Sequence, residues 1–266
     1  MSIAQELSVE AGRIVLKHYD GVIEVGMKGP NDPVTQADKD SNEFITQQLQ
    51  KLFPQDGILA EESRDDLSRL EKQRVWLVDP MDGTREFVDK VGQFAVMIGL
   101  AHQGRPVLGV VYQPTTDTMF YAVQGRGAHL RRGGEKRRLA VSQVARMEEM
   151  RLVVSRSHRA PLVTAIKETL GLQKEVASGS VGLKVGLLVE QKSDLYLHPN
   201  SKTKEWDTCA PQIILEEAGG CMTDCWGEPL RYNKKNVFNA QGFVASNKRL
   251  HAEIVTRMRP FLDNLD

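Results

Sequence analysis

The sequence is poor in the residues that build disulfide scaffolds and zinc sites. Its 266 residues include three cysteines, Cys209, Cys221 and Cys225, and six histidines that form no concentrated set. An odd number of cysteines without a recognisable secretory leader is typical of a reducing compartment, so we expect a cytoplasmic protein. A zinc site is not expected, because no group of histidines accompanies Cys221 and Cys225.

The sequence also lacks an excess of charge of either sign and any long apolar run. Lysine and arginine together number 35, and so do aspartate and glutamate. This balance does not favour binding to a nucleic-acid polymer or a membrane surface. No apolar run approaches the roughly 20 residues of a membrane-spanning helix, so no integral membrane segment is expected. The basic tract over residues 131–138 is interpreted as a solvated hairpin tip.

The hydrophobic pattern predicts an α+β fold with a first half over residues 1–145 and a second half over residues 146–266. Ser2 is a candidate cap for the first helix. The expected helices cover residues 2–20, about 34–53, 161–170, from the loop 178–184 to about 191, 206–218 and 248–263. The expected strands cover residues 23–27, 57–60, a run that ends at residue 79, an antiparallel meander over 93–130, and residues 152–155, 195–197, 221–224 and 242–246.

The most informative stretch is a turn from a strand to a helix. The strand is expected to end at Asp79, because Pro80 lacks the N–H group that would continue the pairing. A second carboxylate, Asp82, follows, and Gly83 and Thr84 then open a helix. Paired carboxylates bind hard cations, and the N–H groups of a helix start attract anions. The turn therefore predicts metal-assisted phosphoryl chemistry.

Acidic residues recur where apolar strands end or helices begin. They are Asp38, Glu61, Asp79, Asp82 and Asp207. Taken alone, Asp38 is best interpreted as a carboxylate that matches the dipole of its helix. The whole set exceeds the needs of general acid–base catalysis and suits two or three Mg²⁺ ions, which prefer oxygen ligands. Zn²⁺ is less favoured, because histidines are scarce.

Two motifs of other enzyme mechanisms are absent. The sequence contains neither a Gly-x-Ser-x-Gly segment nor a Walker phosphate loop. A covalent serine mechanism and a nucleotide-driven motor are therefore not expected. Attack by a water molecule that a metal and a nearby threonine hydroxyl activate is the simpler mechanism.

Four segments resemble the signature motifs of the lithium-sensitive, magnesium-dependent phosphomonoesterase superfamily. They are Val-Thr-Gln-Ala-Asp over 34–38, Ala-Glu-Glu-Ser over 60–63, Asp-Pro-Met-Asp-Gly-Thr over 79–84 and Trp-Asp-Thr-Cys-Ala-Pro over 206–211. This superfamily includes inositol monophosphatases, fructose-1,6-bisphosphatases and 3'(2'),5'-bisphosphate nucleotidases. The resemblance covers nearly the whole chain. It implies a layered αβαβα sandwich whose site lies at the junction of the two halves.

The resemblance also implies the ligands of the metal ions. Glu61, Asp79 and the backbone carbonyl of Met81 would bind one Mg²⁺, and Asp79, Asp82 and Asp207 would bind a second. A third, more hydrated ion would lie near Glu61, which places this residue in the catalytic group. The first half of the chain would then carry most of the metal ligands.

Further roles follow from the same resemblance. Thr84, held by Asp38, would help to deprotonate the attacking water. The N–H groups of Gly83 and Thr84 would hold the phosphate, and Asp207 would also lie beside the substrate.

Substrate specificity would come from the second half, where three segments resemble the nucleotidases. They are residues 155–158 with His158, residues 179–184 with Ser180 and Lys184, and residues 204–211. From the residues alone, His158 is better interpreted as a capping or surface residue, whereas a solvated Lys184 at a helix entry is as simple an interpretation as a phosphate contact. Inositol monophosphatases place a glutamate in the strand before Trp-Asp, and residues 194–200 contain none.

The resemblance thus implies a nucleotidase that hydrolyses 3'-phosphoadenosine 5'-phosphate to AMP and phosphate, as a step linked to sulfate assimilation. The alternatives are a monophosphatase acting on inositol 1-phosphate or another small molecule, and a silent protein that binds metal or nucleotide. A phosphate-release assay with and without Mg²⁺ separates these hypotheses. The sequence leaves open lithium sensitivity, activity on the sulfated nucleotide, and the choice between a monomer and a homodimer.

Overall fold

The computed structural model describes residues 1–29, 32–157 and 159–262 of the chain. The helices of this part are α1 (Ser2–Tyr19), α2 (Gln36–Leu52), α3 (Thr84–Val88), α4 (Pro161–Thr169), α5 (Val181–Val189), α6 (Glu205–Glu217) and α7 (His251–Leu262), with short 3-10 helices η1 (Ser68–Glu71), η2 (Pro114–Thr116) and η3 (Met147–Glu149). The strands are β1 (Val25–Gly29), β2 (Asp32–Thr35), β3 (Gly57–Ala60), β4 (Arg74–Asp82), β5 (Ala95–His102), β6 (Arg105–Gln113), β7 (Thr118–Val123), β8 (Ala128–Arg132), β9 (Glu135–Arg138), β10 (Arg151–Ser155), β11 (Lys174–Ser178), β12 (Leu195–His198), β13 (Cys221–Thr223) and β14 (Phe243–Ser246).

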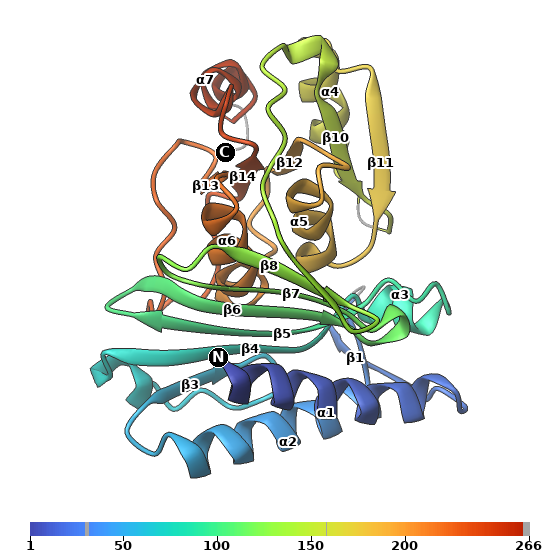
Figure 1. Ribbon diagram of the computed structural model, residues 1–266, viewed down its shortest axis with the longest axis vertical. Helices are drawn as coiled ribbons and strands as arrows, with labels where there is room; N and C mark the ends of the chain where they lie inside the picture. The colour runs from blue at the N-terminus through green and yellow to red at the C-terminus, as the bar shows by residue number, and fades with distance from the viewer. Residues whose placement is uncertain (30–31, 158, 263–266) are drawn as a thin grey trace.

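Helices and sheets alternate in layers, which Figure 1 shows from bottom to top. Helices α1 and α2 form the lowest layer, and a seven-stranded sheet lies on them. Helices α5 and α6 separate this sheet from a five-stranded sheet, and α4 and α7 cover the far side of the latter. This arrangement confirms the α+β class and the αβαβα sandwich.

The two sheets differ in how their strands connect. The first sheet has the order β3-β4-β5-β6-β7-β8-β9 and is antiparallel except for the pair of β3 and β4, so it contains the predicted meander. The second sheet has the order β11-β10-β12-β14-β13, and β10 runs parallel to both of its neighbours. Parallel strands require crossover connections, which place helices over the faces of this sheet.

Helix α6 lies at the centre of the molecule. Ten of its 13 residues are buried, which is typical of a helix enclosed between layers. Two strand glycines let it approach the first sheet closely. An added Cβ at Gly109 would lie 2.5 Å from the carbonyl oxygen of Ala210, and one at Gly99 would lie 2.7 Å from the sulfur of Cys209. This close packing fixes where the N-terminal turn of α6 lies.

Several boundaries differ from the sequence-based expectations. Met1, and not Ser2, precedes the first helix, and no side chain caps it. Residues Asp32–Thr35 pair with β1 as a strand, where a loop and a helix start were expected. Strand β11 was missed because its mostly exposed residues Lys174–Ser178 show no apolar pattern. The boundary between halves at residue 145 stays a prediction.

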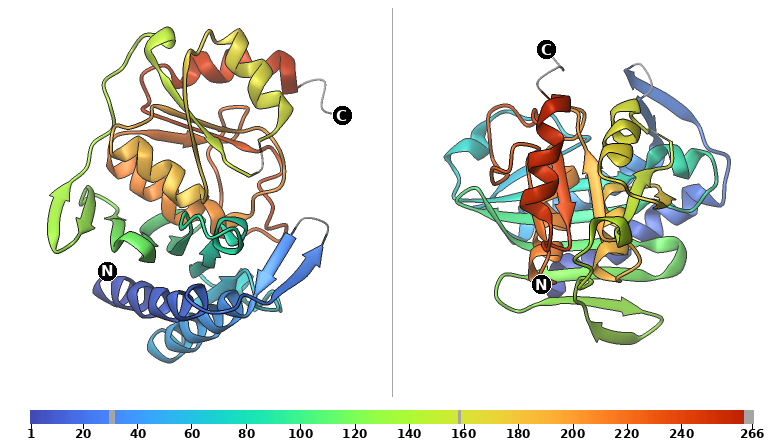
Figure 2. Two further views of the ribbon diagram at one scale, coloured as in Figure 1. Left: turned by 90° about the vertical axis from the view of Figure 1, so that its right-hand side faces the viewer. Right: turned by 90° about the horizontal axis from the view of Figure 1, so that it is seen from above.

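Two hairpins extend the layered body. The hairpin of β1 and β2 stands away from the layers in both views of Figure 2. The predicted basic hairpin over residues 131–138 is formed by β8 and β9 and turns at Gly133 and Gly134. Two of its arginines, Arg132 and Arg137, pair with Glu190 at 3.1 Å, so it is only partly a free solvated tip.

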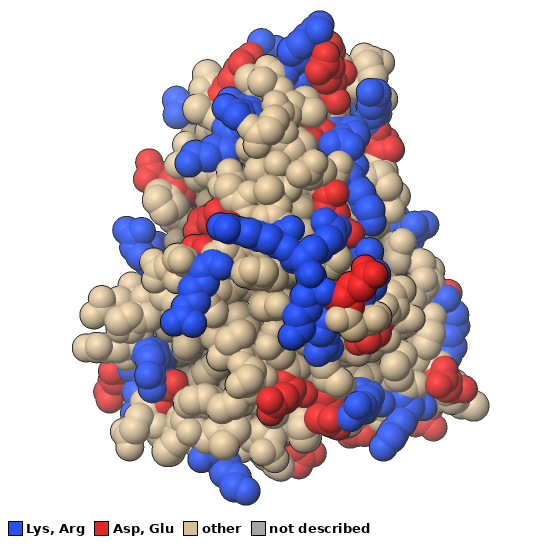
Figure 3. All heavy atoms as spheres, in the orientation of Figure 1, with Lys and Arg blue, Asp and Glu red and all other residues tan. Residues whose placement is uncertain are grey.

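The surface carries mixed charge. On the face shown in Figure 3, basic and acidic side chains are interspersed, in keeping with their equal numbers. In the described part of the chain, no helix combines the length and the apolar character needed to span a membrane.

Candidate active site

The end of β4 contains an irregularity that redirects the chain. The pairing of β4 with β5 shifts register between Asp79 and Asp82, so that Pro80 and Met81 stand opposite a single residue. Such a β-bulge bends the strand and re-aims its side chains. The expectation that the strand ends at Asp79 is therefore wrong, because it continues through the bulge to Asp82.

Gly83 turns the chain from this bulge into α3. Its φ of +103° lies in the left-handed region that side chains disfavour. An added Cβ would also lie 2.8 Å from the carbonyl oxygen of Gln93. Glycine is therefore the residue that fits here, and α3 begins at Thr84 as predicted.

The hydroxyl of Thr84 is held by a carboxylate from another helix. Thr84 Oγ1 donates to Asp38 Oδ1 at 3.0 Å. The other carboxylate oxygen of Asp38 accepts from the backbone N–H and the hydroxyl of Thr35, both at 2.7 Å. Burial raises the pKa of Asp38 to about 6, although these hydrogen bonds oppose the rise. The structure thus brings together Asp38 and Thr84, which are 46 positions apart.

Carboxylates from three separate segments gather beside this pair. Asp79 is only 1% exposed, and burial, followed by the charges of Glu61, Asp82 and Asp207, raises its pKa well above the usual range. Burial, followed by Glu61 and Asp82, raises the pKa of Asp207 to about 8. We call Glu61, Asp79, Asp82 and Asp207 the acidic group. Its members repel one another, with Asp79 buried and the other three partly exposed.

The acidic group fits a hard divalent cation in charge and in donor type. Like charges held close together are stabilised by a compensating positive charge, and carboxylate oxygens suit Mg²⁺. Among the residues that the structure describes, no three Asp, Glu, His or Cys side chains form a ready-made metal cage. The Asp82 carboxylate instead accepts from Ser180 Oγ at 2.5 Å and from the N–H of Gly182 at 3.0 Å.

Lys184 lies beside the same acids. Its ammonium is buried, donates to the carbonyl oxygen of Ser180 at 2.9 Å and lies 5.3 Å from the centroid of the Tyr196 ring. Burial lowers the pKa of Lys184, whereas Asp82, Glu86 and Asp207 raise it. The alternative of a solvated lysine is therefore wrong, because this side chain is 3% exposed.

Asp207 is fixed by the start of its own helix. Its Oδ2 accepts from the N–H of Lys204, just before α6, at 2.6 Å. The ammonium of Lys204 lies 5.0 Å from the centroid of the Trp206 ring, a cation–π contact. The carboxylate therefore has a defined position before any ligand binds.

The structure describes some of the predicted nucleotide contacts and not others. His158 lies outside the described residues. Its neighbour Ser157 donates to Glu86 at 2.7 Å, which ties this segment to α3. Gln93 accepts from the N–H of Gly179 at 2.9 Å, which ties the loop before Ser180 to the first half. Both contacts cross between the halves of the chain.

A comparison with known families covers almost the whole chain. Residues 1–261 match the family described as "Inositol monophosphatase family". The chain belongs to the inositol monophosphatase family.

Relatives within this family include nucleotidases. The chain is 36% identical over 243 residues to the 3'(2'),5'-bisphosphate nucleotidase CysQ of Aggregatibacter actinomycetemcomitans, covering 90% of this chain and 89% of the relative. It is 35% identical to the CysQ of Escherichia coli strain K12, covering 91% and 97%.

Solved structures of the inositol monophosphatase family have the same fold. CysQ from Bacteroides thetaiotaomicron has a TM-score of 0.78 at 30% identity, with 91% of this chain and 95% of that chain covered. An IMPase from Thermotoga maritima has a TM-score of 0.85 at 26% identity, with 100% and 98% covered. The fold alone does not separate the two activities that these names carry.

Sequence reasoning missed two residues that this family member places beside the acidic group. Glu86, 4% exposed, lies on α3 two positions after Thr84. Burial raises the pKa of Asp82, and the charge of Glu86 adds to that rise. Tyr196, 1% exposed, lies on β12 next to Lys184. Neither belongs to a motif, and only the position of Glu86 in the first turn of a helix was a signal.

Proposed function

We propose that this member of the inositol monophosphatase family is a Mg²⁺-dependent 3'(2'),5'-bisphosphate nucleotidase that hydrolyses 3'-phosphoadenosine 5'-phosphate to AMP and phosphate. The observation that most strongly supports this substrate is the buried ammonium of Lys184 beside the acidic group. A substrate with two phosphates needs a fixed cation for the phosphate that is not cleaved. The relatives named CysQ support this choice over an inositol phosphate.

The acidic group would hold the metal ions. Glu61, Asp79 and the carbonyl of Met81 are proposed for one Mg²⁺, and Asp79, Asp82 and Asp207 for a second, with a third near Glu61. When bound, Mg²⁺ supplies charge stabilisation for the attacking and leaving oxygens. If Asp82 binds a metal ion, its hydrogen bonds with Ser180 and Gly182 at the start of α5 would weaken.

The residues of the chain would supply proton transfer and orientation. Thr84 Oγ1 would take a proton from the attacking water while passing its own to Asp38 Oδ1, along the 3.0 Å hydrogen bond. A carboxylate whose pKa is about 6 is suited to accept a proton near neutral pH. The N–H groups of Gly83 and Thr84 would hold the phosphate that is cleaved.

The second half would hold the nucleotide. Lys184 would bind the 5'-phosphate, Ser180 and Asp207 would lie beside the substrate, and His158 is proposed as a further nucleotide contact. Ser180 is the residue before α5, and the start of a helix favours a nearby anion.

A substrate panel tests the proposal. Phosphate release is measured from 3'-phosphoadenosine 5'-phosphate and from inositol 1-phosphate at the same low concentration, with Mg²⁺ present and with a chelator. The proposal expects Mg²⁺-dependent release that is at least tenfold faster from the nucleotide. Equal or faster release from inositol 1-phosphate would overturn the substrate, and no release from either would leave a binding protein.

A further inference from the structure

A buried carboxylate joins the start of α6 to the loop over residues 233–239, which lies between β13 and β14. Glu205 is fully buried, and its two oxygens accept from the N–H groups of Asn233 and Lys234 at 2.6 and 2.9 Å. The ammonium of Lys234 lies 4.0 Å from the same carboxylate. Asp207 follows two positions after Glu205 on the same helical turn. The loop therefore fixes the turn that carries a member of the acidic group.

The same loop is also fastened to the first half of the chain. Arg69 lies on η1, in the connection from β3 to β4 that begins with Glu61, and is 1% exposed. Its guanidinium donates to Asn233 Oδ1 at 2.8 Å and to the carbonyl oxygen of Lys234 at 3.0 Å. Asn233 Nδ2 returns a hydrogen bond to the carbonyl oxygen of Arg69 at 3.0 Å. Asp65 holds the guanidinium from the other side at 2.8 Å.

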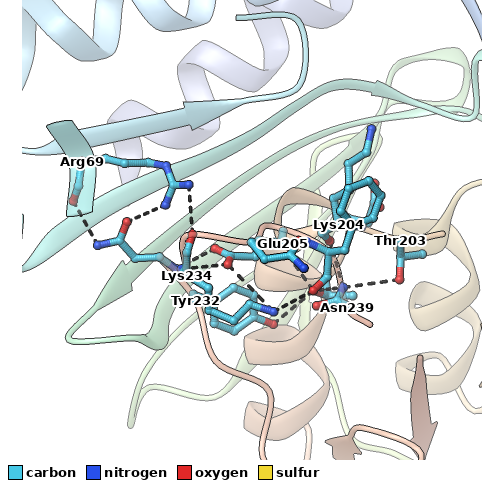
Figure 4. A network of polar contacts seen from close by, with 12 residues as sticks. Arg69, Thr203, Lys204, Glu205, Tyr232, Lys234 and Asn239 are labelled. Atoms are coloured by element: carbon cyan, nitrogen blue, oxygen red, sulfur yellow. Dashed lines mark hydrogen bonds and ion pairs between the residues drawn. The ribbon is translucent and has the colours of Figure 1, made fainter. Parts of the chain in front are cut away.

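Figure 4 shows this network, with Arg69 at one end and Thr203 at the other. Beyond Glu205, Asn239 Nδ2 donates to the carbonyl oxygen of Lys204 at 3.0 Å, and the N–H of Asn239 donates to the carbonyl oxygen of Thr203 at 2.9 Å. The loop thus holds the chain on both sides of the helix start, and Arg69 anchors the loop.

These contacts connect two segments, one from each half, that each carry a carboxylate of the acidic group. Glu61 precedes the segment of Arg69, and Asp207 follows Glu205, so the network sets how these two segments lie relative to each other. A metal site tolerates only small errors in ligand position, on the order of 0.5 Å. Residues that orient ligands without touching the metal typically change its affinity by about 10–100-fold.

We propose that Arg69, Asn233 and Glu205 are positioning residues that hold the start of α6 against the first half and so set the affinity of the acidic group for divalent cations. The inference rests on the proposed function for the choice of Mg²⁺ as the cation. It concerns residues that touch neither the metal nor the substrate.

The test is a Mg²⁺ titration of the Arg69→Met variant of the full chain. The rise in melting temperature with Mg²⁺, measured without substrate, reports binding, and phosphate release reports activity. The half-saturating Mg²⁺ concentration is expected to rise about tenfold in both assays, because the ligand segments lose their common anchor. The kcat at saturating Mg²⁺ is expected to stay within about threefold, because the bound cation restores the ligand positions.

Arg74→Met is the matched control. Arg74 lies at the end of the same connection but is exposed, and it pairs with Asp56 at 2.7 Å, away from the loop. Its variant is expected to keep the Mg²⁺ affinity. Arg69→Lys keeps a charge for Asp65 but cannot reach both Asn233 and Lys234, so it should share the defect. A wild-type Mg²⁺ affinity in Arg69→Lys would show that the positive charge, and not the paired hydrogen bonds to Asn233 and Lys234, matters. This result would overturn the proposal.

Other outcomes are equally decisive. An unchanged Mg²⁺ affinity in folded Arg69→Met overturns the positioning role. The role is also overturned if Mg²⁺ does not change the melting temperature of the wild-type protein. If Arg69→Met does not fold, the same titration of Asn233→Ala, which retains the Arg69–Asp65 pair, takes its place. If the wild type binds Mg²⁺ but releases no phosphate from the nucleotide, the proposed function fails while the melting titration still tests the positioning role.

Discussion

Helices α2 and α6 begin in the same way, but their first turns have different surroundings. In each, an aspartate at the third helical position accepts from the backbone N–H of the residue before the helix. Asp38 accepts from Thr35 at 2.7 Å, and Asp207 accepts from Lys204 at 2.6 Å. This is the reciprocal half of a capping box, and it satisfies a backbone donor that the helix leaves unpaired.

The two carboxylates differ in what lies beyond their own helix. Asp38 faces hydroxyl donors on Thr35 and Thr84, and burial raises its pKa to about 6. Asp207 faces the carboxylates of Glu61 and Asp82, which add to the effect of burial and raise its pKa to about 8. Hydrogen-bond donors favour the ionised form and like charges oppose it. One local motif thus yields a proposed proton acceptor in one place and a proposed cation ligand in another.

The largest effect should come from Asp207→Asn. Loss of a proposed metal ligand is expected to lower kcat by about 10³-fold, because several kcal/mol of transition-state stabilisation depend on the bound cation. The metal-free protein should keep or gain stability, since an amide needs no proton to be accommodated beside the other acids and its oxygen still caps the helix. Steady-state kinetics and chelator-treated melting curves check both. Near-normal turnover would remove Asp207 from the metal site.

Asp38→Asn should have a smaller effect of a different kind. We expect kcat to fall by about 10²-fold, because Thr84 would lose its proton acceptor. The half-saturating Mg²⁺ concentration should stay within about twofold, because Asp38 touches no proposed ligand side chain. A loss of Mg²⁺ affinity comparable to that of Asp207→Asn would mean that the two helix starts share one role.

Lys184→Met tests the first turn of α5, which carries a cation, whereas the first turns of α2 and α6 carry acids. The KM for 3'-phosphoadenosine 5'-phosphate is expected to rise by at least about tenfold, the value of one lost charge-assisted hydrogen bond. The KM for a simple aryl monophosphate should change by less than about twofold. Equal changes for both substrates would exclude Lys184 from the 5'-phosphate site.

The last effect concerns the stability of the folded chain against pH, and not its catalysis. The pKa of Asp38 is raised in the folded chain from 3.8 to about 6. Its contribution is therefore fully present below the unfolded value and is lost as the pH rises from about 4 through about 6, at a cost of up to about 3 kcal/mol. Urea unfolding of the metal-free protein at pH 4 and pH 7 should show this loss in the wild type and a smaller loss in Asp38→Asn. Identical losses would mean that Asp38 is ionised with its ordinary pKa.

Much of the fold was predictable because apolar periodicity reports burial directly. Helix α1 and the antiparallel meander followed from such patterns. The layered class followed from the family motifs as well. Strand β11 was not predictable, because its exposed edge carries no pattern. The bulge at Asp79 was hidden for another reason: Pro80 normally ends pairing, and only the partner strand β5 shows that pairing resumes.

The candidate site divides in the same way. The acids of the motifs could be proposed from the sequence because each follows an apolar run or opens an expected helix. Glu86 and Tyr196 were missed because their importance comes from neighbours on other elements, Asp82 and Lys184. Arg69 gave no signal at all, since its partner Asn233 lies 164 positions away.

By itself, the sequence determined the elements that carry the proposed site: the glycine turn after Asp82 and the two helices whose first turns carry Asp38 and Asp207. These depend on interactions within a few residues, which local chemistry fixes. Only the tertiary structure decided which of these acids repel one another, which accept a hydroxyl, and that Lys184 is buried among them. The charge environment and the burial of a charged side chain depend on residues that are distant in the chain, and no local pattern encodes them.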